Sequence, residues 1–242
     1  MTAPAAVKQP SLWEDLLEIF YAPRAVFERR RETPAFGMAL LVLVVLAVGL
    51  TLAFASITEP IFTAEFNRGM ASAVKKNPQM TPEMIANARS VSMKFTPAIV
   101  AFFSVVGPLL IGLAAWLVGK IFESKAQLGQ MMMVATYAMF PRLIEAILNA
   151  VQMLVLPEDG IKGRYSVSLG LGRFLDPDTQ QLLLSILGRV DVFTIWVTFI
   201  IAVGISVMGK IPMARAAIAA AVVWILGALP GLLGAVQATA AR

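Results

Sequence analysis

Residues 35–57 read AFGMALLVLVVLAVGLTLAFASI, an apolar stretch without a single charged side chain. The hydrocarbon core of a bilayer is ~30 Å thick and an α-helix rises ~1.5 Å per residue, so about 20 apolar residues make one crossing. Four further apolar stretches follow, at residues 95–118, 128–156, 192–208 and 216–236. The sequence therefore predicts an all-α fold: a polytopic membrane helix bundle with five transmembrane helices.

The composition supports this prediction and narrows the function. The 242 residues are 58% hydrophobic and only 14% charged, which favours one membrane domain at residues 35–242 after an N-terminal segment at residues 1–34. Cysteine and histidine are both absent. We therefore expect no metal site, no cofactor and no enzyme activity, because the usual thiolate and imidazole groups are missing.

Basic residues predict the orientation and the partners. They cluster in the short connections next to the apolar stretches, and such loops face the cytoplasm. We expect a cytoplasmic N-terminus and a C-terminus outside. The net charge of +5 then favours anionic lipid headgroups as partners and argues against nucleic acid. The residues behind this assignment are Arg29, Arg30, Arg31, Lys120, Lys125, Lys210 and Arg215.

The N-terminal segment has the pattern of an amphipathic helix. Ser11 stands three residues ahead of Glu14, as in a capping box, and apolar residues then alternate with acidic ones. We expect this segment to lie flat on the anionic inner leaflet, docked to the membrane surface. The alternative is that the basic run only fixes the topology. The docking residues would be Trp13, Arg24, Arg29, Arg30 and Arg31.

The two longer loops, on the opposite side, carry short interfacial helices. In the first loop, apolar residues recur every four positions from Phe62 to Val74, and Thr81-Pro82 then starts a second short helix. In the other loop a leucine-rich stretch ends at Gly188. Asp191, directly before the fourth apolar stretch, is expected to cap that helix or to pair with Arg189.

Several stretches resemble the Yip family, the Ypt-interacting-protein membrane domain, and in particular its short bacterial branch. They are IFYAPRAVFERRRETP at 19–34, TPEMIANARS at 81–90, VATYAMFPRLIEAIL at 134–148 and RVDVFTIWVTFIIAVGISVMGKIPMARA at 189–216. The resemblance implies five spans, a cytoplasmic N-terminus and a bacterial inner membrane. It supplies no catalytic signature, and the GTPase link of eukaryotic relatives depends on a longer cytoplasmic region than this one.

A polar stripe interrupts the third apolar stretch. Its four members are spaced three, four and three residues apart, which places them on one face of a helix: Arg142, Glu145, Asn149 and Gln152. An unpaired charge inside a bilayer is costly, so the stripe should face protein or water. It could line a hydrophilic pathway or bind a headgroup phosphate. Alternatively, it is an internal ion pair, or the span starts near Tyr137 and leaves Arg142 close to the cytoplasmic headgroups.

Other residues in the spans suit helix packing. A small-xxx-small pair allows close approach of helices, within one bundle or between two copies of the chain. Tryptophans inside spans are expected to pack within the bundle, because they lie away from the interfacial belt. The residues assigned to packing are Pro141, Trp196, Trp224, Gly227 and Gly231.

Together these patterns predict a non-enzymatic membrane organiser or partner-binding scaffold. Its partners would be the lipid bilayer and either another membrane protein or a second copy of the chain. The alternative is a transporter, channel or lipid-handling protein with a polar pathway along the third span. A dry, mutually paired Arg142 and Glu145 favours the scaffold, whereas a solvated pair in a continuous cavity favours transport.

Overall fold

The computed structural model describes residues 11–157, 160–178 and 180–240. Within these ranges the chain is built from helices, and β pairing is limited to one isolated bridge between Gly170 and Asp191. The predicted all-α fold is confirmed. Four helical stretches are long and apolar enough to span a membrane, and a bent pair of helices makes a fifth if it counts as one span. The predicted number of five spans is reached if this bent pair is counted as one span.

The first predicted span turns sharply before its expected end. Helix α3 covers Gly37–Ala53, and α4 follows at Ala55–Lys76 with an angle of 85° between the two. Residues 54–57, which the hydropathy had assigned to the span, therefore form the corner and the start of α4. The first charged side chain after the apolar stretch, Glu59, follows shortly after this corner.

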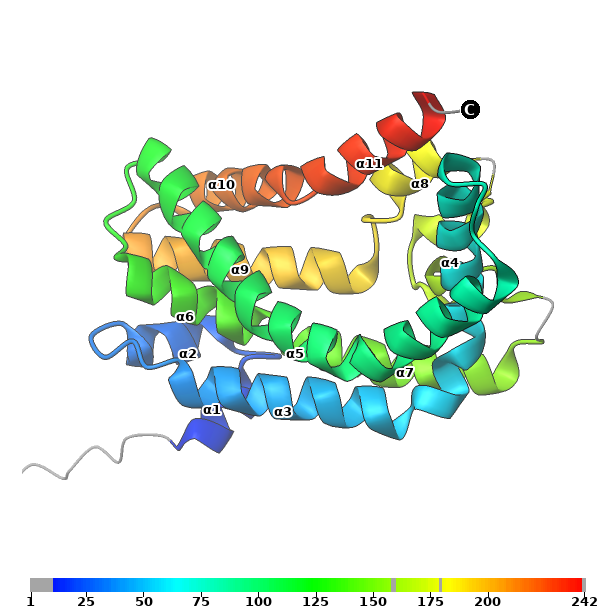
Figure 1. Cartoon of the computed structure of the whole chain (residues 1–242). Helices are drawn as coiled ribbons and strands as arrows, with labels where there is room; N and C mark the ends of the chain where they lie inside the picture. The colour runs from blue at the N-terminus through cyan, green and yellow to red at the C-terminus, as the bar shows by residue number, and fades with distance from the viewer. Residues whose placement is uncertain (1–10, 158–159, 179, 241–242) are drawn as a thin grey trace, which may run out of the picture.

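The second span is longer than predicted. Thr81 caps α5 by accepting a hydrogen bond from the Met84 N–H at 3.2 Å, with Pro82 in the first turn. The predicted helix start is confirmed, but the separate short helix is wrong, because α5 runs without interruption over Pro82–Ile121. No Gly or Pro lies between residues 83 and 96 to end the helix. Helix α5 curves along its length, and both Pro97 and Pro108 lie inside it (Figure 1).

The third and fifth spans are each divided into two helices. Helices α6 (Leu128–Ala138) and α7 (Pro141–Val155) meet at a tight turn, where the N–H groups of Met139 and Phe140 bond to carbonyls three residues back. Pro141 explains the break, because it has no N–H with which to continue the hydrogen bonds of α6. Helices α10 (Met213–Leu226) and α11 (Leu229–Ala240) are likewise joined by a short turn. The fourth span, α9 (Val192–Gly209), agrees with its predicted bounds within one residue.

Helix α9 lies at the centre of the bundle. It packs on α6, on α10 and on the N-terminal helix α2, while α5 packs on α6, α3 and α10 (Figure 1). Two close helix contacts depend on glycine. A Cβ at Gly204 of α9 would come within 2.2 Å of the Val134 side chain on α6, and one at Gly112 of α5 would come within 2.8 Å of the Met132 backbone. These glycines, which were not among the predicted packing residues, let the helices approach closely.

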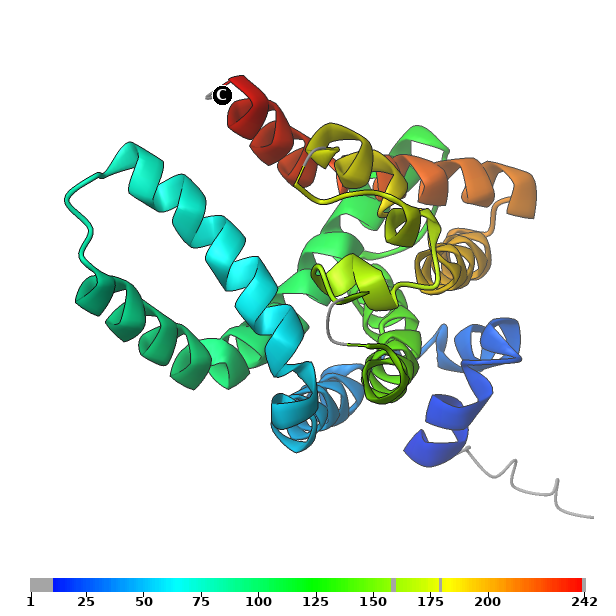
Figure 2. The ribbon, with the colours of Figure 1, turned by 90° about the vertical axis from the view of Figure 1, so that its right-hand side faces the viewer.

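The bundle has two distinct ends. We call one of them the Gly209 end; it contains the connections at residues 31–36, 122–127 and 210–212. There the Lys125 N–H donates to the Gly209 carbonyl at 3.0 Å, and the Gln130 side-chain amide donates to the Arg31 carbonyl at 2.8 Å. At the other, the α4 end, lie α4, α8 (Gln181–Leu187) and the irregular segment 160–178 with its 3-10 turns η2 (Arg164–Val167) and η3 (Leu171–Phe174) (Figure 1). Helix α4 and the first part of α5 form a hairpin that projects from the bundle (Figure 2).

The N-terminal segment forms two short helices that fold against the bundle. These are α1 (Leu12–Glu18) and α2 (Pro23–Arg30), and the predicted capping box between Ser11 and Glu14 is confirmed. Val26 and Phe27 are fully buried in the same core as the spans, and the Phe20 ring lies 5.9 Å from the Trp196 ring of α9. One face of the segment therefore packs on the bundle, while Trp13, Leu17 and Tyr21 stay exposed. Residues 1–10 of the predicted segment fall outside the described part of the chain.

Candidate functional site

The polar stripe of α7 contains an ion pair. Arg142 donates through Nη1 to the Glu145 carboxylate at 2.6 Å, one helical turn further along. Both side chains are half-buried, since 37% of the Arg142 side chain and 23% of the Glu145 side chain are exposed. The remaining members lie further along the same helix: Asn149 faces a cavity, and the Gln152 amide donates to the Val167 carbonyl of η2 at 2.7 Å.

The stripe is joined to the start of α9. Asp191 caps this helix by accepting hydrogen bonds from the N–H groups of Phe193 and Thr194, each at 2.9 Å, which confirms the predicted cap. The Thr194 hydroxyl donates to the other Asp191 oxygen and accepts from Nη2 of Arg142 at 2.7 Å. Arg142 and Asp191 are themselves 3.9 Å apart. We call Arg142, Glu145, Asp191 and Thr194 the Arg142 cluster.

This arrangement fixes the position of Arg142 along the bundle. The cluster lies at the first turn of α9, near the α4 end, whereas the connection before α6 bonds to Gly209 at the last turn of α9. Arg142 is therefore remote from the basic connections at residues 122–127 and 210–212. Arg142 therefore does not lie among the basic residues from which the cytoplasmic side was predicted.

The loop at the α4 end holds the cluster in place. Leu171 N–H bonds to the Val190 carbonyl at 3.0 Å, and Gly170 pairs with Asp191 in the isolated bridge. A Cβ at Gly170 would come within 2.5 Å of the Asp191 Cβ, so this contact requires glycine. The Gly170-Leu-Gly172 sequence thus brings two backbone segments together, and it has none of the strand-to-helix context of a phosphate loop.

A cavity of about 560 Å³ opens beside the Arg142 cluster. It lies between α3, α4, α5 and α7 and is walled mostly by apolar side chains of the spans. Arg142, Asn149 and Arg164 supply amide and guanidinium groups to one side of it, and hydroxyl groups come from the helices opposite. The residues that supply these hydroxyl groups are Thr51, Thr58 and Ser104.

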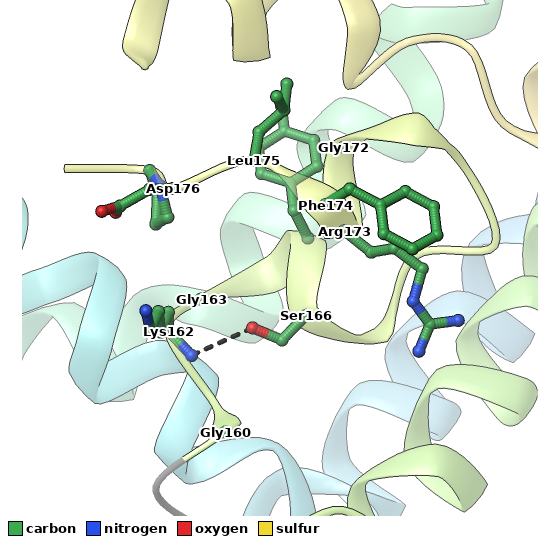
Figure 3. Close-up of a pocket in the computed structure, with 11 residues that line it drawn as sticks. Gly160, Lys162, Gly163, Ser166, Gly172, Arg173, Phe174, Leu175 and Asp176 are labelled. Carbon is green, nitrogen blue, oxygen red and sulfur yellow. Dashed lines mark hydrogen bonds between the residues drawn. The ribbon is translucent and has the colours of Figure 1, made fainter. Parts of the chain in front are cut away.

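A second hollow, of about 330 Å³, lies within the loop at the α4 end, as Figure 3 shows. It is lined by residues of the segment 160–177, and the Lys162 N–H donates to the Ser166 hydroxyl across it at 2.9 Å. Three glycines contribute to its wall, together with charged residues such as Lys162, Arg173 and Asp176. Within the part of the chain that the structure describes, no group of three or more His, Cys, Asp or Glu side chains could hold a metal ion.

The N-terminal basic residues form a separate charged cluster. The fully buried Asp15 carboxylate accepts hydrogen bonds from Arg29 at 2.7 Å and from Arg30 at 2.6 Å, and Arg29 also pairs with Glu18 at 2.5 Å. Burial acts to lower the pKa of Arg29, but the bonds and charges of Asp15 and Glu18 outweigh it and raise the pKa above its ordinary value. We call Asp15, Arg29 and Arg30 the Asp15 cluster.

The other residues assigned to surface docking stay on the surface. Trp13 is 64% exposed, Arg24 forms an exposed one-turn ion pair with Glu28, and Arg31 lies beside Glu32. The structure thus separates the predicted docking set into two groups. Arg29 and Arg30 are turned toward Asp15, while the remaining three face outward.

The residues assigned to helix packing also fall into two groups, those that pack inside the bundle and those that do not. Trp196 packs between Phe20 and Phe193, and Pro141 is buried at the start of α7. Trp224 lies instead against the guanidinium group of Arg189, whose Cζ is 5.8 Å from the ring centroid. A Cβ at Gly227 would meet that guanidinium at 3.1 Å, whereas one at Gly231 would meet nothing within 4 Å. Arg189 forms no ion pair with Asp191, contrary to one of the two sequence-based possibilities.

Comparison with known proteins adds one finding. The family model described as the Yip1 domain matches residues 17–234, which includes α2 and the candidate spans, except the last two residues of the final one. No curated protein and no solved structure matches the chain significantly.

Proposed function

Because this multi-pass membrane protein belongs to the Yip1 domain family, we propose that it acts as a non-enzymatic membrane organiser or partner-binding scaffold. The proposal rests on one observation, the pairing inside the Arg142 cluster. Arg142 is shared between Glu145 and Thr194, and Asp191 is taken up by the cap of α9. Groups that are committed to one another in this way hold helices together, whereas catalysis or transport needs groups that can exchange partners.

We further propose that the Gly209 end faces the cytoplasm of a bacterial inner membrane. The basic residues Lys125 and Lys210 belong to connections at this end, and Arg215, in the first turn of α10, pairs there with Glu123 at 3.0 Å. Positive residues in short loops favour the cytoplasmic side. Helix α11 lies beside α8 at the α4 end, which supports a C-terminus outside.

Surface docking by the N-terminal segment remains part of the proposal, with a smaller set of residues. The outward-facing Trp13 and Arg24 would contact the headgroup region, since a tryptophan and an arginine suit that layer. Arg24→Glu together with Trp13→Ala should weaken binding to vesicles that contain phosphatidylglycerol. Unchanged binding by the folded double variant would remove this docking role.

Reconstitution into proteoliposomes tests the scaffold proposal. The wild-type protein should carry neither ions nor lipids at a rate above that of empty vesicles. Chemical cross-linking in native membranes should capture a second copy or another membrane protein. Flux that Glu145→Gln abolishes, while the variant stays folded, would overturn the proposal in favour of transport.

The cavity beside the cluster supports a second candidate, a lipid-handling protein. Its volume of about 560 Å³ and its apolar walls suit a hydrocarbon chain, and Arg142 and Arg164 supply positive charge on one side. Exchange of fluorescent phosphatidylglycerol between leaflets measures this activity. Exchange that is lost in Ser104→Phe, whose side chain would fill the cavity, would favour the lipid-handling role over the scaffold.

A further inference from the structure

A groove of about 400 Å³ runs between α9 and α10, away from the Arg142 cluster. We call it the α9–α10 groove. Its floor is shallow because small side chains face each other across it, and its rims are large apolar side chains that are exposed on the bundle surface, Ile195 at 62% and Phe199 at 51%. Both helices are candidate membrane spans, so the groove faces lipid. Its small residues are Ala202, Ala217 and Ala221.

One cation closes the groove at its α4 end. Arg189 donates through Nη2 to the Trp224 carbonyl at 3.2 Å and lies against the Trp224 ring. Its Nε atom is buried and has no hydrogen-bond partner, and no acid in the described ranges forms an ion pair with Arg189. The nearest acid in sequence, Asp191, is already taken up by the α9 cap and by Thr194. A guanidinium with an unused donor therefore stands beside an apolar groove.

The surroundings of Arg189 favour an anion from outside the chain. Burial lowers the pKa of Arg189, and the positive charge of Arg142 acts in the same direction, while Tyr165 and the negative charge of Asp191 offset this lowering only in part. Because an arginine stays protonated even so, an anion beside it would relieve both the missing hydrogen bond and the unbalanced charge. Gly227 leaves the space in which the guanidinium sits.

We propose that the α9–α10 groove binds one anionic phospholipid, with a phosphate oxygen on Arg189 and an acyl chain along Ala221 and Ala217. The groove extends from Trp224 to Met213, which at ~1.5 Å per residue is about 16 Å, close to half of a ~30 Å hydrocarbon core. It therefore accommodates a chain from one leaflet. Arg189 stands three residues before α9 and so lies at the end of that span, where headgroup phosphates are found. A phospholipid can contact the apolar floor with its acyl chain and the guanidinium with its phosphate.

Native mass spectrometry of the whole protein, titrated with phosphatidylglycerol, phosphatidylcholine or inorganic phosphate, tests this proposal. The wild type should retain one phosphatidylglycerol in preference to phosphatidylcholine. Arg189→Gln should weaken phosphatidylglycerol binding about tenfold, as expected for the loss of a charge-assisted hydrogen bond. Ala217→Phe should reduce the binding of both phospholipids, because the ring occupies the path of the chain. Inorganic phosphate should not compete, since it cannot use the groove.

Two matched variants serve as controls. Arg173→Gln removes an exposed arginine from the same end of the bundle, and Ile218→Phe adds a ring to the neighbouring exposed position of α10. Both should bind phosphatidylglycerol like the wild type. If Arg189→Gln does not fold, Ala217→Phe decides alone. Wild-type affinity in folded Ala217→Phe, equal affinity for the two phospholipids, or full competition by inorganic phosphate would overturn the proposal.

Discussion

The two charged clusters of the bundle use the same chemistry in different surroundings. In the Asp15 cluster a fully buried carboxylate is shared by Arg29 and Arg30. In the Arg142 cluster the arginine side chain is 37% exposed and borders a cavity of about 560 Å³. The two clusters therefore differ mainly in how deeply their charged groups are buried. The first cluster fastens the N-terminal helices to each other, while the second also holds helices but leaves one face open to a ligand.

The largest effect is expected at the Asp15 cluster. Asp15→Asn removes the buried carboxylate that Arg29 and Arg30 share, and breaking a buried ion pair costs about 3 to 5 kcal/mol. Thermal and denaturant unfolding in detergent micelles should show this loss of stability, together with increased proteolysis within residues 11–34. A variant as stable as the wild type would mean that the N-terminal helices are held by apolar contacts alone.

A smaller effect is expected where the loop meets the Arg142 cluster. Gly170→Ala places a Cβ 2.4 Å from the Val190 carbonyl oxygen, so the loop must move away from Asp191. Overpacking of this kind costs about 1 to 3 kcal/mol. Denaturant unfolding measures the loss. Gly129→Ala is the matched control, because a Cβ there meets nothing within 4 Å and should not reduce stability.

Removal of one hydroxyl group tests the link between α7 and α9. Thr194→Val deletes the group that accepts from Arg142 and donates to Asp191. The expected loss is about 1 to 2 kcal/mol, since the buried Asp191 carboxylate and the half-buried Arg142 guanidinium each lose a partner. Thr198→Val is the control, because the Thr198 hydroxyl bonds only to a carbonyl of its own helix. Equal stabilities for the two variants would show that Arg142 does not depend on α9.

The smallest effect is expected at the exposed pair of α2. Glu28→Gln removes the partner of Arg24, and both side chains are more than half exposed, at 53% and 65%. A surface pair of this type contributes about 0.5 kcal/mol or less. The unfolding midpoint should change little, and less in high salt. A loss as large as that of Asp15→Asn would contradict the contrast between buried and exposed pairs.

The sequence correctly predicted the features that depend only on neighbouring residues. The capping box at Ser11 and Glu14, the helix start at Thr81 and the cap at Asp191 each depend on residues at most three positions apart. Hydropathy likewise placed α9 correctly, because its length and composition alone determine a span. The stripe on α7 was also visible, since helical periodicity places its members on one face.

Tertiary contacts explain what the sequence did not reveal. No local signal shows that Arg29 and Arg30 meet Asp15, because the contact depends on the turn between α1 and α2. The closest helix contacts at glycines within the described chain were not predicted either. Gly227 and Gly231 have the spacing of a packing motif, yet the tight helix contacts occur at Gly112 and Gly204. Spacing shows where helices could approach, and the fold determines where they do.

The most direct test of the account is the sidedness of the two ends of the bundle. The chain has no cysteine, so single cysteines report without interference. Lys125→Cys at the Gly209 end should react with an impermeant maleimide only in inside-out vesicles, and Lys162→Cys at the α4 end only in intact spheroplasts. Labelling of both positions from the same side, or the reverse pattern, would contradict the proposed arrangement of spans.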